Sequence, residues 1–133
     1  MKAYLFDTSA LLTLRDDEEG AQIVADLLQQ AQNGKIQCFG CFITQMEILY
    51  RVWKDENEQA GKLAYEMVMS LPINWIHEDK HLLELSASIK ATHSLSLADA
   101  WIAASAIQQN AFLVHKDPEF KVVECLQLEL PYK

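Results

Sequence analysis

The chain opens with Ala3-Tyr4-Leu5-Phe6-Asp7-Thr8-Ser9-Ala10-Leu11-Leu12, and this stretch sets the pattern for the rest of the sequence. Residues 3–6 are apolar or aromatic and end at an acid, which predicts a short buried strand. A helix is expected from about Ser9, directly after that strand. Asp7 is thereby expected at the carboxyl end of the first strand.

Short apolar runs and amphipathic stretches alternate over the remaining chain. Further buried strands are expected at 38–43, 73–76 and 111–114, and a half-exposed edge strand at 126–130. Apolar residues at helical spacing predict helices between these strands, and Pro72 ends one of them. This alternation favours an α/β domain with a mainly parallel sheet, whose ligands bind beyond the carboxyl ends of the strands.

The length and composition favour one soluble domain over residues 1–133. Apolar residues make up 50% of the chain, which is enough for a buried core. The longest apolar runs are far shorter than a membrane span, and no basic segment followed by an apolar one opens the chain. Three cysteines form no even disulfide framework. We therefore expect a cytoplasmic protein without membrane association.

Acidic residues outnumber basic residues by 19 to 11, which gives a formal net charge of −8. This balance argues against a protein that holds nucleic acid by overall positive charge. It is compatible with an enzyme that gathers its own acids around metal ions.

Four acids from distant segments are expected at one edge of the sheet. Asp7 ends the first strand and Asp117 follows the fourth, while Glu47 and Asp99 lie in the first turns of two helices that begin near that edge. Like charges about 4 Å apart repel by ~1 kcal/mol in water and ~4 kcal/mol at an effective dielectric of about 20. Helix N-termini offset roughly 0.3–1 kcal/mol each. Such a site needs protons or a divalent cation, and oxygen ligands suit Mg²⁺ or Mn²⁺.

A purely structural interpretation of the same acids is also open. Glu47 and Asp99 each lie three residues after a Thr or Ser, which is the spacing of a capping box. Asp7 and Asp117 could be solvated acids at strand ends. The pattern by itself indicates the cluster without establishing it.

Four segments, taken in order, resemble the motifs of PIN domains. They are Tyr4–Leu12, Thr44–Arg51, Ser96–Ala106 and Phe112–Phe120, of which the third is the most specific. The resemblance covers nearly the whole chain, and the length is similar to that of a VapC-like toxin of a bacterial toxin–antitoxin pair. It implies a three-layer α/β/α fold with a central, mainly parallel sheet of about five strands.

The resemblance also implies a Mg²⁺- or Mn²⁺-dependent endoribonuclease. Asp7 and Asp99 would be the central metal ligands, Glu47 and Asp117 would complete the acidic pocket, and Ser9 would support the first carboxylate. Water activated by the metal would attack the scissile phosphate and leave a 5′-phosphate and a 3′-hydroxyl. The resemblance further implies a homodimer and inhibition by a small antitoxin that blocks the groove.

One position departs from the family pattern. The family usually has a small hydroxyl residue two positions before the last acid, and this chain has His115 there. An imidazole is larger than a hydroxyl, titrates near neutral pH and could bind metal or phosphate. The alternative is a strand-end histidine that faces solvent.

RNA binding by so acidic a chain needs local basic residues. Arg15, Arg51 and Lys54 lie near the first two acidic motifs and Lys116 adjoins the fourth, so we predict these four as phosphate contacts. The main rival to a nuclease is a PIN-like module that binds RNA or protein with a weak or inactive site. A PIN-fold enzyme acting on structured DNA is disfavoured, because the chain has no room for the insertions such enzymes use.

Two patterns that resemble zinc sites are not favoured. The segment His77–His81 has the letters of a zinc-hydrolase motif, but Asp79 is expected to cap a helix that begins after His77. Cys38 and Cys41 have the spacing of a metal-binding pair without a second pair. Their apolar strand predicts buried structural thiols.

Overall fold

The expected step from a strand into a helix opens the structure. The computed structural model describes residues 1–132. β1 (Ala3–Phe6) is followed by Asp7 and then directly by α1 (Thr8–Arg15). The Asp7 carboxylate accepts a hydrogen bond from the backbone N–H of Ala10, and this N-cap starts the helix one residue earlier than the sequence indicates.

Five parallel strands form the central sheet in the order β3-β2-β1-β4-β5. The other strands are β2 (Gln37–Cys41), β3 (Asn74–Ile76), β4 (Phe112–His115) and β5 (Gln127–Glu129). The chain runs outward from β1 to β2 and β3, and then returns to the other side of β1 for β4 and β5. Sheets with this order bind ligands where the direction reverses, beyond the carboxyl ends of β1 and β4.

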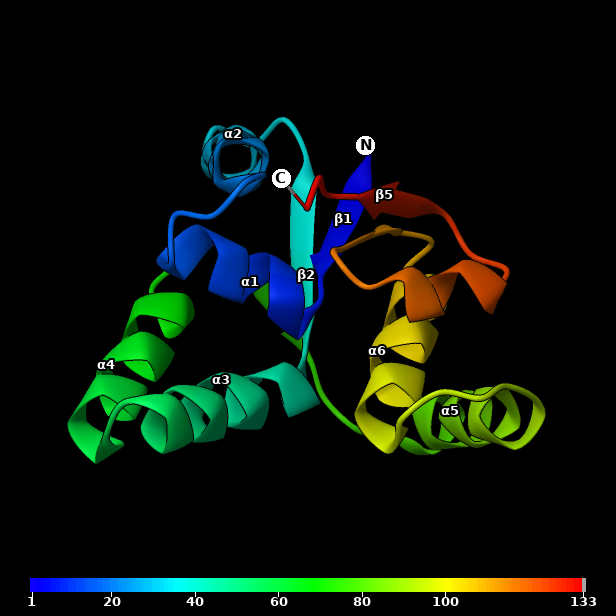
Figure 1. Ribbon diagram of the computed structural model, residues 1–133. Coiled ribbons are helices and arrows are strands. Elements are labelled where there is room, and N and C mark those ends of the chain that lie inside the picture. The colour runs from blue at the N-terminus through cyan, green and yellow to red at the C-terminus, as the bar shows by residue number, and fades with distance from the viewer. Residues whose placement is uncertain (133) are drawn as a thin grey trace.

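Helices cover both faces of the sheet (Figure 1). One face carries α1 together with α2 (Ala21–Gln32), α3 (Phe42–Asp55) and α4 (Glu58–Met69). The other face carries α5 (Lys80–Thr92), α6 (Leu97–Gln108) and the short 3₁₀ helix η1 (Pro118–Val122). The predicted three-layer α/β/α fold with a parallel sheet of five strands is therefore confirmed.

The strands supply two separate cores because alternate side chains point to opposite faces of a sheet. Leu5 and Leu113 pack in one core with Ala103 of α6, whereas Phe6 and Val114 pack in the core on the other face. The alanine-rich α6 is buried on nearly all sides, and its small side chains let the sheet approach closely.

α6 has only 12 residues, and no helix within residues 1–132 is both long and apolar enough to cross a membrane.

The second junction between strand and helix differs from the expectation. The strand ends at Cys41, two residues earlier than expected, and α3 begins at Phe42 without a side-chain cap. Thr44 lies inside the helix, where its hydroxyl is 3.1 Å from the hydroxyl of Thr8. The predicted capping box of Thr44 and Glu47 is wrong, because both side chains contact α1 instead.

α3 and α4 approach each other closely at Gly61. A Cβ atom at this position would lie 2.6 Å from the backbone oxygen of Leu49 and 2.9 Å from the Cβ of Trp53. Backbone atoms cannot rotate aside as a flexible side chain can. The contact therefore requires glycine, even though glycine is a poor helix former.

Gly61→Ala should destabilise the protein despite the better helix propensity of alanine. Propensity favours alanine by about 1 kcal/mol, whereas overpacking typically costs about 1–3 kcal/mol. We expect a net loss of roughly 1 kcal/mol in the free energy of unfolding, measured by urea denaturation. Gln59→Ala, on the exposed side of α4, is the control and should leave the midpoint unchanged. Equal midpoints for Gly61→Ala and wild type would show that the two helices can move apart freely.

Candidate functional site

Asp7 lies between β1 and α1 and is 3% exposed. The Ser9 hydroxyl is 2.7 and 2.9 Å from its two carboxylate oxygens, and the Ala10 N–H donates to one of them at 2.8 Å. The same Ser9 hydroxyl accepts a hydrogen bond from the backbone N–H of Lys116 at 3.0 Å. Ser9 thereby connects the first carboxylate to the segment that follows β4.

Glu47 comes from α3 and is 8% exposed. The Thr8 hydroxyl donates to its Oε1 at 2.6 Å, and the Arg51 guanidinium lies 3.2 Å from its Oε2. Because α1 and α3 both contribute to these contacts, the carboxylate of Glu47 is fixed near the end of β1 rather than free in solvent.

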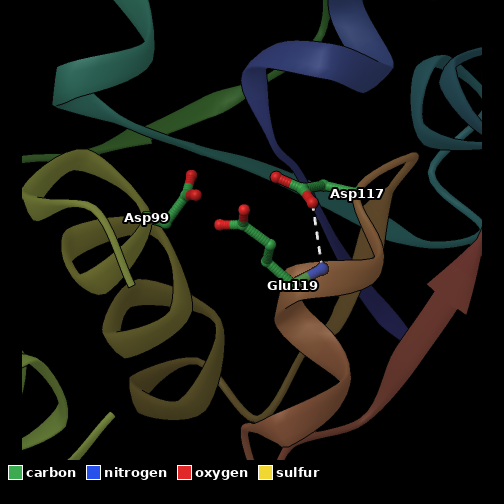
Figure 2. Close-up of side chains that lie close together, drawn as sticks. All are labelled: Asp99, Asp117 and Glu119. Atoms are coloured by element: carbon green, nitrogen blue, oxygen red, sulfur yellow. Dashed lines mark hydrogen bonds between the residues drawn. The ribbon is translucent and has the colours of Figure 1, made fainter. Parts of the chain in front are cut away.

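Three further carboxylates converge from the other side of the site. Asp99 lies in the first turn of α6, where its backbone N–H donates to the Ser96 hydroxyl at 3.1 Å. Asp117 and Glu119 come from the segment after β4. Carboxylate oxygens of Asp99, Asp117 and Glu119 lie within 4.8 Å of one another, and Figure 2 shows the side chains directed toward a shared space. No other group of three such ligands is found in residues 1–132.

Glu119 is an acid that the sequence motifs do not indicate as part of the site. The Asp117 carboxylate caps η1 by accepting a hydrogen bond from the Glu119 N–H at 2.9 Å (Figure 2). Pro118 occupies the start of this helix, where proline is favoured. The tight turn brings residue 119 back beside residue 117. The Asp-Pro-Glu sequence is the signal from which this arrangement could have been predicted.

The carboxylates share one electrostatic environment. Burial raises the pKa of Asp7 from 3.8 to about 7 against the effect of its hydrogen bonds, and the charges of Asp99 and Asp117 add to the shift. Burial also raises the pKa of Asp99 to about 6, with further increases from the charges of Asp117, Glu47 and Glu119. The cluster therefore favours either protons or a cation among its acids.

The donor atoms fit a hard divalent cation. The converging ligand atoms are all carboxylate oxygens, which suit Mg²⁺ or Mn²⁺ better than zinc or copper.

His115 is fully buried, so the alternative of a solvent-facing histidine is wrong. Its Nε2 lies 2.9 Å from Oε1 of Gln127, and its Nδ1 accepts a hydrogen bond from the backbone N–H of Asp117 at 3.1 Å. The ring also packs against Phe120, with 5.1 Å between ring centroids. Both ring nitrogens are occupied within the protein, so the imidazole is not available as a ligand for metal or phosphate.

Two of the four basic residues are engaged in ion pairs with acids that do not belong to the cluster. Arg15 lies at the far end of α1, about 12 Å along the helix axis from Asp7, and pairs with Glu56 at 2.9 Å. The Lys116 side chain is only 12% exposed and lies 3.7 Å from Glu18. Both are therefore poorly disposed to bind phosphate.

The other two basic residues lie on α3, the helix that carries Glu47. Arg51 pairs with Glu47 at the edge of the site. Lys54 is exposed and forms no ion pair within residues 1–132. These two residues are the better candidates for contacts with an anionic ligand.

Neither of the zinc-like patterns forms a cluster within the described residues. Asp79 caps α5 and His77 precedes this cap, so His77 and His81 are not one turn apart on a single helix. Cys38 and Cys41 are buried and belong to the cores on opposite faces of the sheet. Burial raises the pKa of Cys38 to about 12. The interpretation of these cysteines as structural thiols is confirmed.

Comparisons with known proteins agree with this fold. The model of the PIN domain family matches residues 4–124. DNA-bound VapBC from Salmonella typhimurium is 18% identical, with 97% of this chain and 98% of that chain covered and a TM-score of 0.76. VapBC2 from Rickettsia felis, bound to a DNA fragment from the promoter, is 18% identical, with 97% of this chain and 99% of that chain covered and a TM-score of 0.74. A toxin–antitoxin complex from Klebsiella pneumoniae is 25% identical, with 91% of this chain and 92% of that chain covered and a TM-score of 0.63.

The fold and site define an α/β protein with carboxylates gathered where the strand order of its parallel sheet reverses. Because the family model spans nearly the whole chain, the protein belongs to the PIN domain family, as its motifs predicted. Among curated proteins, no sequence matches this chain.

The raised pKa of Asp7 predicts how stability depends on pH. The folded state holds a proton up to about pH 7, whereas the unfolded state releases it near 3.8, so stability is lost as the pH rises through 7. Asp7→Asn removes the ionised form and keeps an oxygen for the Ala10 N–H. In EDTA, the variant should melt several degrees above wild type at pH 8 and gain much less at pH 5, as measured by calorimetry. The same difference at both pH values would show that Asp7 does not cause the pH dependence.

Proposed function

We propose that this chain is a Mg²⁺- or Mn²⁺-dependent endoribonuclease and the toxin of a toxin–antitoxin pair. The observation that carries the proposal is the convergence of Asp99, Asp117 and Glu119 beside the buried Asp7 and Glu47. Membership of the PIN domain family supports a nuclease, and the likeness to VapBC complexes supports a toxin.

The carboxylates have the chemistry to hold the metal. We propose Asp7 and Asp99 as central ligands, with Glu47 and Asp117 completing the pocket and Glu119 as an added acid on its open side. When bound, a divalent ion supplies activation of water and stabilises the charge that develops on a phosphodiester during in-line displacement.

The surrounding residues would hold this arrangement ready for substrate. Ser9 orients the Asp7 carboxylate, and Thr8 and Arg51 orient Glu47, so these acids need not reorganise when RNA arrives. Cleavage would leave the phosphate on the 5′ end of one product and a hydroxyl on the 3′ end of the other.

An apolar hollow beside the carboxylates supports a macromolecular partner. It has a volume of about 520 Å³, and its lining includes Glu47, Met46, Tyr50 and Leu97. The last three side chains are between 45% and 67% exposed, and apolar surface of this kind is typical of interaction sites. On the family resemblance we propose a small antitoxin that blocks the site, a homodimer and a cytoplasmic location.

Asp99→Asn should abolish RNA cleavage without unfolding the protein, because it removes a central ligand and relieves repulsion. Glu124→Gln makes the same change in charge at an exposed acid outside the cluster and should cleave like wild type. Cleavage of a labelled RNA and of a DNA of the same sequence would be followed in EDTA, Mg²⁺, Mn²⁺ and Zn²⁺.

The same proteins would be melted with each ion. Mg²⁺ or Mn²⁺ at about one hundred times its dissociation constant should stabilise wild type by ~2.7 kcal/mol and Asp99→Asn much less. Cleavage by Asp99→Asn at the wild-type rate would disprove the assignment. RNA binding without cleavage in Mn²⁺ would instead favour an inactive binding module.

Lys54 provides a test of the path that RNA takes across α3. In the cleavage-deficient Asp99→Asn background, Lys54→Gln should weaken RNA binding. It should also reduce, by about one, the slope of the logarithm of the RNA-binding constant against the logarithm of the salt concentration. Lys62→Gln, which removes an exposed lysine from α4, is the matched control. An unchanged slope for Lys54→Gln would remove this residue from the RNA contacts.

A further inference from the structure

His115 connects three elements at the carboxyl edge of the sheet. It is the last residue of β4, and its backbone oxygen accepts a hydrogen bond from the Leu130 N–H at 2.7 Å, just after β5. Its ring contacts Phe120 of η1, and its two nitrogens contact Gln127 of β5 and the backbone of Asp117. No part of the residue is exposed to solvent.

The hydrogen bonds fix one tautomer of the imidazole. The Gln127 side-chain nitrogen donates to the backbone oxygens of Phe120 at 2.7 Å and Val123 at 3.1 Å. Its Oε1 is therefore the atom that faces His115, and an amide oxygen only accepts. The backbone N–H of Asp117 only donates, so Nδ1 must accept. His115 thus carries its proton on Nε2 and presents a lone pair at Nδ1.

The Nδ1 contact lies at the start of the segment that carries two of the acids. Held by its N–H, Asp117 places its own carboxylate oxygen 2.9 Å from the Glu119 N–H and so begins η1. That turn brings the carboxylates of Asp117 and Glu119 within 4.8 Å of Asp99. The imidazole itself touches none of these carboxylates in the described hydrogen bonds.

We propose that His115 is a positioning residue for the carboxylate cluster, acting through its Nδ1 bond to the Asp117 amide. The proposal deepens the proposed function and rests on it for the identity of the cation. A merely structural role would require only the volume of the ring and the bond from Nε2 to Gln127. The two roles depend on different nitrogens, which makes them separable.

Two variants divide the functions of the ring. In His115→Asn, the side-chain oxygen can take the place of Nδ1 and accept from the Asp117 N–H, while the contact with Gln127 is lost. In His115→Gln, the longer amide can reach Gln127 in the place of Nε2, while the acceptor near Asp117 is lost. Both leave a cavity, and melting in EDTA establishes that each variant is folded before it is compared.

The measurements are Mn²⁺ affinity, from the paramagnetic resonance signal of free Mn²⁺, and hydrogen exchange of the Asp117 amide in metal-free protein. We expect His115→Gln to bind Mn²⁺ about tenfold more weakly than wild type, as for other residues that support metal ligands. Its Asp117 amide should also exchange faster. His115→Asn should keep both properties near wild type even if it melts at a lower temperature.

Equal losses of Mn²⁺ affinity in the two folded variants, or none in either, would overturn the proposal. So would nitrogen NMR of wild type showing the proton on Nδ1. A wild-type protein that binds no Mn²⁺ would defeat the proposed function instead. In that event the tautomer and the exchange of the Asp117 amide, both measured without metal, still decide whether His115 positions this segment.

Discussion

The fold holds several carboxylates close together at the edge of the sheet, and their mutual repulsion determines what the surrounding groups must compensate. Asp7 is almost completely buried, and both Asp7 and Asp99 have pKa values raised by burial and by neighbouring acids. Water would normally screen such charges, but here much of it is excluded. The helix N-termini and hydroxyl groups around the cluster compensate only in part. A cation or bound protons must supply the remainder, and this requirement is the physical basis of the proposed metal-dependent function.

The order of the strands creates that situation. β1 and β4 are neighbours in the sheet although about a hundred residues separate them, and each ends in a segment that carries an acid. Cores on both faces hold the two strands in place, and the N–H of Asp7 bonds to the oxygen of Val114 at 3.0 Å where they end. The framework is therefore largely apolar, and the buried acids Asp7 and Glu47 and the buried His115 lie at its carboxyl edge. Such a division allows charged groups to be held close without loss of the fold.

Several features followed from sequence because they depend on neighbours along the chain. The strand that ends just before Asp7 and the helix that follows Ser96 were both evident from local sequence patterns. The cap of α6 was predicted from the spacing of Ser96 and Asp99, and it is present. The Thr44 cap failed for the opposite reason, since a hydroxyl that can cap its own helix can also contact another. Local spacing cannot distinguish these two outcomes.

The pattern of residues along the chain predicted an α/β domain with a mainly parallel sheet and indicated that Asp7, Glu47, Asp99 and Asp117 would gather at its carboxyl edge. Hydrophobic periodicity indicates the alternating strands and helices, and the strands of a parallel sheet end at the same edge. The local pattern does not show that Glu119, once turned back beside Asp117, lies close to Asp99, nor that His115 is buried with both nitrogens engaged. The bonds of His115 depend on β5 and η1 meeting β4, and contacts between distant segments leave no periodic trace in the sequence.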